Sequence, residues 1–131
     1  MKRIALLVAA CIVLAACGGG SGSPAPTGIA ASGEELFERR VLGTNAGCIT
    51  CHSLRPGVQL VGPSLSAIGL DARDRVAGRD ARSYIKESIL DPEAFIFGGF
   101  ESGKMPADWG DQLSAEEVDA IVEYLLTRTE R

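Results

Sequence analysis

Histidine, methionine and lysine are scarce in this 131-residue chain. It contains one histidine, His52, and one methionine besides the initiator, Met105. After the third residue there are two lysines and no run of basic residues, which argues against nucleic acid as a partner. The sequence also lacks an alternating run that is long enough for a convincing strand. It therefore predicts an all-α fold, in which only one imidazole is available to a metal ion.

The first residues have the composition of an export signal. Met1-Lys2-Arg3 is basic, and the 13 residues from Ile4 to Ala16 form an apolar run too short to span a bilayer. The run leads into Leu14-Ala15-Ala16-Cys17, which resembles a bacterial lipobox and implies cleavage before Cys17 and lipidation of its thiol. An ordinary signal followed by an incidental cysteine is the alternative. We expect a signal peptide over residues 1–16 and an exported lipoprotein, anchored to a membrane and facing the periplasm or another extracytoplasmic side.

Two of the four cysteines remain for chemistry in the folded protein. Cys11 leaves with the signal and Cys17 carries the lipid, so Cys48 and Cys51 are too few for a disulfide framework. Cleavage also removes two of the 13 basic residues and leaves 11 against 17 acidic ones, a formal charge of −6. The mature chain is therefore expected to be an acidic, soluble domain.

The chain after the signal divides into a tether and one domain. Residues 18–31 are uncharged and rich in glycine, serine and proline, which is typical of a flexible linker. The lipidated cysteine and this tether together occupy residues 17–31. The remaining 100 residues, 32–131, suffice for one domain with a modest core.

Three helices are predicted within that domain, each after a capping residue: Ser32, Asp80 and Ser114. Ser32 and Ser114 are each followed by a glutamate three residues later, the pattern of a capping box. The first helix should stop by Gly43 and the second at Pro92. The third has an apolar face with intervals of three and four residues: Val118, Ile121, Val122 and Leu125.

The segment Cys48-Ile49-Thr50-Cys51-His52 admits several kinds of site. A thioredoxin-like redox pair needs a βαβ pattern, a zinc site needs four ligands, and a bare disulfide leaves His52 unexplained. Cys-x-x-Cys-His is the pattern of covalent haem attachment, in which both thiols bond to the porphyrin and the histidine reaches the iron. In an exported helical chain this pattern favours one haem c, and a thiol pair beside a surface histidine is the alternative.

Two further stretches, Gly62-Pro63-Ser64-Leu65 and Gly103-Lys104-Met105-Pro106, extend this pattern. With the attachment segment they resemble the class I c-type cytochromes over nearly all of residues 32–131. The resemblance implies a cytochrome c fold, with three main helices and long loops around one haem. It implies that the carbonyl of Pro63 orients His52 and that Leu65 packs on the haem. It also implies that the iron is ligated by His52 and Met105.

The likeness extends to the cytochrome c domain fused to some bacterial oxidase subunits II, through residues 84–92 and the last helix. In class I cytochromes the first and last helices cross, which implies that Gly33 and Phe37 meet Tyr124. Two other residues are candidates for contacts with haem propionates, although packing or solvation explains them as well: Trp109 and Arg55.

These features predict an electron carrier and not a catalytic enzyme, because an iron with both axial positions filled has no place for a substrate. The scarcity of lysine favours redox partners with a basic docking face, and we expect a monomer. Three alternatives are a fixed subunit of an oxidase or other oxidoreductase complex, a haem sensor or peroxidase in which Met105 does not bind, and a haem-free thiol–disulfide protein.

Overall fold

A computed structural model describes residues 25–131, so the predicted signal peptide, Cys17 and residues 18–24 of the tether lie outside the described part. Helices dominate that part, and one two-stranded ladder is the only sheet in it. The elements in chain order are α1 (Ile29–Glu38), β1 (Val41–Leu42), β2 (Asn45–Ala46), α2 (Cys48–Cys51), α3 (Ile68–Asp71), the 3-10 helix η1 (Ala72–Asp74), α4 (Ala81–Leu90), α5 (Trp109–Gln112) and α6 (Ala115–Leu126). The predicted helical fold with long loops is confirmed. No helix among residues 25–131 has both the length and the apolar character needed to cross a membrane.

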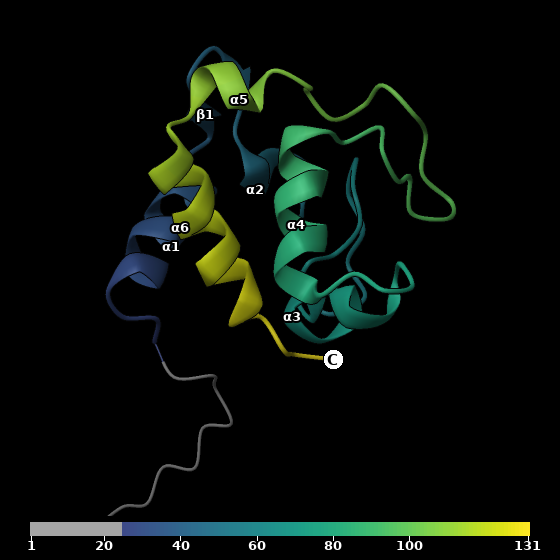
Figure 1. Ribbon diagram of the computed structural model, residues 1–131. Helices are drawn as coiled ribbons and strands as arrows, with labels where there is room; N and C mark the ends of the chain where they lie inside the picture. Colours follow the sequence, from purple (N-terminus) through teal and green to yellow (C-terminus); the bar gives the residue numbers. More distant parts are fainter. Residues whose placement is uncertain (1–24) are drawn as a thin grey trace, which may run out of the picture.

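The first and last long helices, α1 and α6, lie across each other (Figure 1). Gly33 makes this crossing possible, because a Cβ there would lie 1.9 Å from the carbonyl oxygen of Ala120 and 2.9 Å from Cβ of Tyr124. One turn later the rings of Phe37 and Tyr124 are 5.8 Å apart, and both side chains are 1% exposed. The contact expected between Gly33, Phe37 and Tyr124 is therefore present.

The predicted start of the first helix is wrong. The helix α1 begins at Ile29 after Gly28, no side chain caps it, and Ser32 lies inside it. Ala30 and Gly33 are both buried, so packing of the first turns against α6 outweighs the local capping preference of Ser32. The helix ends at Glu38, before Gly43 as predicted, because the chain then turns into the short β1–β2 hairpin.

The hairpin was not predicted, and it positions the segment that follows. Leu42 pairs with Asn45 across a two-residue turn in which Gly43 has φ +60°, a conformation that suits glycine. The backbone N–H of Thr44 donates to Gln112 of α5 at 3.0 Å, and the Asn45 amide donates to Asp108 at 2.7 Å. These bonds hold both ends of α5 close to the chain that leads into α2.

The other two predicted helices are confirmed with their caps. Asp80 accepts a hydrogen bond from the N–H of Ser83 at 3.0 Å at the start of α4, which ends at Leu90. At the start of α6, Ser114 and Glu117 form the reciprocal capping box. The helices α4 and α6 pack against each other, and α2 lies behind the space between them (Figure 1).

Candidate functional site

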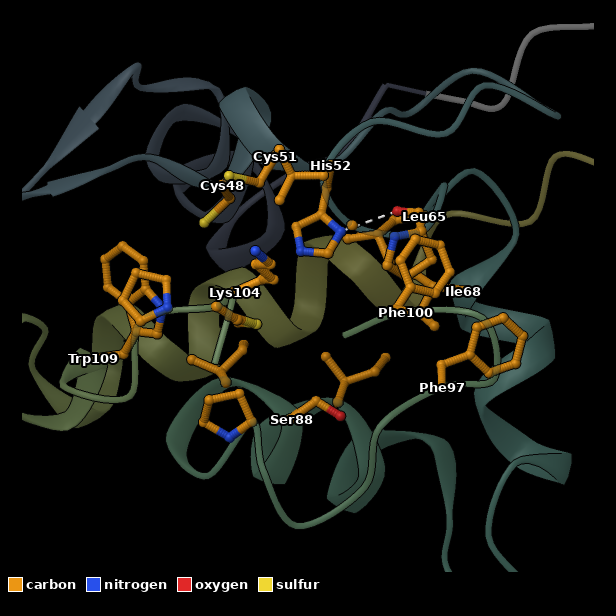
Figure 2. Close-up of a pocket in the computed structure, with 18 of the residues that line it drawn as sticks. Cys48, Cys51, His52, Leu65, Ile68, Ser88, Phe97, Phe100, Lys104 and Trp109 are labelled. Atoms are coloured by element: carbon orange, nitrogen blue, oxygen red, sulfur yellow. Dashed lines mark hydrogen bonds between the residues drawn. The ribbon is translucent and has the colours of Figure 1, made fainter. Parts of the chain in front are cut away.

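The attachment segment forms the one-turn helix α2, and its two thiols lie along one side of a cavity (Figure 2). Gly47 lets this helix start against the end of α1, since a Cβ there would lie 1.9 Å from the carbonyl oxygen of Arg39. Cys48 and Cys51 are three residues apart and therefore share a helix face. Neither is in a disulfide. The structure thus presents both thiols to the same cavity.

His52 follows α2 directly and projects into this cavity (Figure 2). Its Nδ1 lies 3.0 Å from the carbonyl oxygen of Pro63. Because a carbonyl only accepts, Nδ1 carries the proton and Nε2 keeps a lone pair for a metal. Burial lowers the pKa of His52 and so favours the neutral, metal-binding form of the ring. The hydrogen bond to Pro63 has the opposite, smaller effect on this pKa. The hydrogen bond implied between Pro63 and His52 is present.

Gly62 provides the space in which the His52 ring lies. A Cβ on Gly62 would be 2.5 Å from Cε1 and 2.8 Å from Nδ1 of that ring. The backbone N–H of Gly62 donates to the carbonyl of Cys51 at 2.9 Å, and that of Leu65 donates to the carbonyl of Ser53 at 2.8 Å. The stretch around Pro63 is therefore tied at both ends to the chain that carries His52.

The Cys48 thiol does not have the environment of a reactive cysteine. Burial raises the pKa of the Cys48 thiol to about 11, whereas reactive cysteines have a lowered pKa. Among residues 25–131 no three histidine, cysteine or acidic side chains form a cluster that could hold a metal ion, which argues against a zinc site. The alternatives of a thiol–disulfide centre and a zinc site thus lack structural support.

The walls of the cavity are mostly apolar and come from several helices. They include Phe37 of α1, Ile85 and Ile89 of α4, and Ile121 and Leu125 of α6. The predicted residues Leu65 and Met105 also line it, and Leu65 is 9% exposed. The segments that carry His52 and Met105, 53 residues apart in the chain, therefore meet at one cavity.

Trp109, at the start of α5, lines the cavity and is 3% exposed. Its Nε1–H is buried and has no hydrogen-bond partner within the described part of the chain. An orphaned buried donor is costly, so this group favours a ligand with an acceptor, such as a carboxylate. Arg55 is exposed and is absent from the cavity lining, so only one of the two propionate candidates is in place.

An aromatic group that was not predicted from the sequence also lines the cavity. Phe95, Phe97 and Phe100 line it after α4, and the guanidinium carbon of Arg75 lies 3.9 Å from the ring centroid of Phe97. Arg75 also reaches the hydroxyl of Tyr84 at 3.4 Å. A signal was available, because three of the four phenylalanines fall within the six residues 95–100.

These observations together fit a haem. Two thiols and one correctly protonated imidazole lie on one side, the walls are apolar, a thioether is within the lining, and a buried indole N–H lacks an acceptor. A porphyrin is large and apolar and carries two carboxylates at one edge. Each of its parts therefore has a matching feature in this cavity.

Comparisons with known proteins agree with this fit. The model of a family described as cytochrome c oxidase, cbb3-type, subunit III matches residues 28–125. The chain is 35% identical over 92 residues to cytochrome c2 iso-1 of Magnetospirillum fulvum, an alignment that covers 61% of this chain and 89% of the relative. The chain therefore belongs to the class I c-type cytochromes, and it is an electron carrier with one haem c bound covalently through Cys48 and Cys51.

Proposed function

We propose that this cytochrome is a lipid-anchored monomer that passes single electrons between redox partners on the extracytoplasmic side of a membrane, with His52 and Met105 as the iron ligands. The observation that supports this ligand pair is the meeting of His52 and Met105 at one cavity. Each is the only residue of its type after the initiator methionine. Two protein ligands leave no open position on the metal, which suits a carrier and not a catalyst.

The residues around the cavity keep the site in one arrangement. The haem, when bound, supplies an iron that alternates between the ferric and ferrous states. Pro63 holds the orientation of His52 through the hydrogen bond at Nδ1. The apolar walls from α1, α4 and α6 exclude water, and a thioether ligand raises the reduction potential. Fixed ligands and dry walls keep the structural change on electron transfer small.

The proposed lipid anchor is supported by the sequence that precedes residue 25, where the described part of the chain begins. Cys17 precedes the first residue of α1 by twelve positions, and a flexible linker of that length has a reach of roughly 20 Å. In Figure 1 the helix α1 begins at the end of the molecule opposite to α5. A tether attached there leaves the α5 end free, so the domain can pivot between a donor and an acceptor.

The substitution Cys17→Ser tests the anchor. We expect the variant to retain its haem, because Cys17 is not part of the Cys48–His52 attachment motif, and to move from the membrane fraction to the soluble fraction once residues 1–16 are removed. The haem absorbance of each fraction measures this, with the wild-type protein as the control. A Cys17→Ser protein that stays with the membrane in high salt, although its mass shows that residues 1–16 have been removed, would contradict lipidation at this residue.

The charges of the domain support partners with a basic docking face. The formal charge after the signal is −6, and both remaining lysines are already paired. Lys86 lies 2.6 Å from Asp119, and Lys104 lies 3.1 Å from Glu101. No lysine therefore remains to recognise an acidic partner.

This charge balance predicts how salt affects electron transfer. The reduced Cys17→Ser protein should react with a basic redox protein at least about 10-fold faster at low than at high ionic strength, because electrostatic steering is screened by salt. Stopped-flow absorbance measures the rates, and an acidic acceptor of similar potential is the control. A faster low-salt reaction with the acidic acceptor would show that the docking charge is of the opposite sign.

A fixed subunit of an oxidase complex is the second candidate. It is favoured by the matching family, which is described as a subunit of a cbb3-type oxidase. Purification after gentle detergent extraction separates the two functions. A stable complex that keeps the cytochrome through size-exclusion chromatography indicates a fixed subunit, and a free cytochrome indicates a mobile carrier.

A further inference from the structure

The segment that joins α4 to α5 carries Met105 but has little regular structure of its own. We call residues 91–107 the methionine loop. It contains no helix or strand, and residues 93–99 are all exposed. Backbone hydrogen bonds within it join residues only three apart, from Ala94 to Asp91 and from Phe100 to Phe97. The position of Met105 must therefore depend on side chains.

The chain that directly follows the methionine loop is well held. Trp109 is 3% exposed, and the carboxylate of Asp108 accepts the hydrogen bond from Asn45 at 2.7 Å. The middle of the loop is held separately by Arg75, which lies over the Phe97 ring. Apart from the exposed ion pair of Glu101 and Lys104, these contacts do not reach the residues just before Met105.

Glu93 is hydrogen-bonded to this section. Its Oε1 accepts a hydrogen bond from the backbone N–H of Gly103 at 2.8 Å, and its Oε2 accepts one from the hydroxyl of Ser102. The Glu93 carboxylate thus joins two points of the loop that are ten positions apart, Glu93 and Gly103. Gly103 lies two residues before Met105. These two hydrogen bonds, with Ser102 contributing most, lower the pKa of Glu93, so the carboxylate is ionised at neutral pH.

Glu93 is itself fixed to the end of α4. The N–H of Asp91 donates to the carbonyl of Glu87 at 2.7 Å, that of Ala94 donates to Asp91 at 3.1 Å, and Pro92 between them is buried. The carboxylate therefore connects the chain before Met105 to a helix that forms one wall of the cavity. Charge-assisted bonds to N–H and O–H groups are among the stronger hydrogen bonds.

We propose that Glu93 is a positioning residue for Met105, holding the methionine loop closed so that the thioether stays at the cavity. The proposal rests on Met105 as the second iron ligand, as stated above. Without the two hydrogen bonds of Glu93, the loop should open more often at its Ser102–Gly103 section, while Trp109 and Phe97 remain in place. An external ligand competes with Met105, so its apparent affinity rises in proportion to the open fraction.

Imidazole binding to the ferric holoprotein tests the proposal. For Glu93→Ala we expect the apparent association constant to increase about 10-fold, as the open fraction increases. Glu93→Gln should lie between this variant and the wild type, because its amide oxygen can still accept from Gly103. Hydrogen exchange of residues 100–105, measured by mass spectrometry, should increase in the same order.

Two comparisons keep the test specific. Glu101→Gln also removes one negative charge from the loop, but the only interaction that it weakens is an exposed ion pair with Lys104. This variant should therefore bind imidazole as the wild type does. If Glu93→Ala matches Glu101→Gln in both imidazole binding and exchange, the proposal is wrong. Met105→Ala reports on the assumption beneath it: if that variant binds imidazole no better than the wild type, Met105 is not a ligand, and both the ligand assignment and the role of Glu93 are rejected.

Discussion

Replacing both attachment thiols, Cys48→Ala with Cys51→Ala, is expected to eliminate covalent haem and to leave little folded protein. Phe37, Ile121 and Leu125 line the cavity, and each buried side chain of this kind contributes roughly 1.5–3 kcal/mol. The net stability of a domain is only about 5–15 kcal/mol, so poor packing along this wall removes a large fraction of it. Mass spectrometry measures the attached haem, and far-ultraviolet circular dichroism measures the helix content.

The variant Cys17→Ser is the matched control for this loss, because it removes one thiol that is not part of the attachment motif. It should retain the full mass of the attached haem and the wild-type helix content. The single variants Cys48→Ala and Cys51→Ala should each keep at most one thioether bond and fall between the two. A double variant that still carries covalent haem would show that the attachment is not through these residues.

The features that the sequence could predict depend on neighbouring residues. The capping box at Ser114 and the cap at Asp80 act within three positions of the chain, so pattern alone identified the starts of α6 and α4. Cys48, Cys51 and His52 are nearly contiguous, and the stretch around Pro63 is only eleven residues further on. These parts of the site could be recognised from residue types and spacing.

The features that the sequence did not reveal depend on contacts between distant segments. The start of α1 at Ile29 follows from its packing on α6, about ninety residues away, which overrides the local preference of Ser32 for a cap. The hydrogen bond from Gly103 to the Glu93 carboxylate requires the loop to fold back over ten residues. The indole N–H of Trp109 can be recognised as buried and without a partner only when the surrounding residues are placed in space. None of these has a local pattern.

Met105→Ala should have the second large effect, because it removes the thioether from the cavity while His52 stays in place. The reduced variant should bind carbon monoxide readily, whereas the wild type should not. The sulfur-to-iron absorption band of the ferric protein should disappear. The reduction potential should fall by on the order of 0.1 V or more, since axial ligands set haem potentials over about 0.8 V and a thioether favours the ferrous state.

The comparison of Met105→Ala with Glu93→Ala separates ligation from positioning. The first removes the proposed ligand, so the sulfur-to-iron band should be lost at every temperature. The second leaves the ligand but lets the loop open, so the band should persist and weaken on heating at a lower temperature than in the wild type. A wild-type protein that binds carbon monoxide as readily as Met105→Ala would remove Met105 from the iron. The open position would then favour a sensor or a peroxidase over a carrier, despite the support that Pro63 gives to His52.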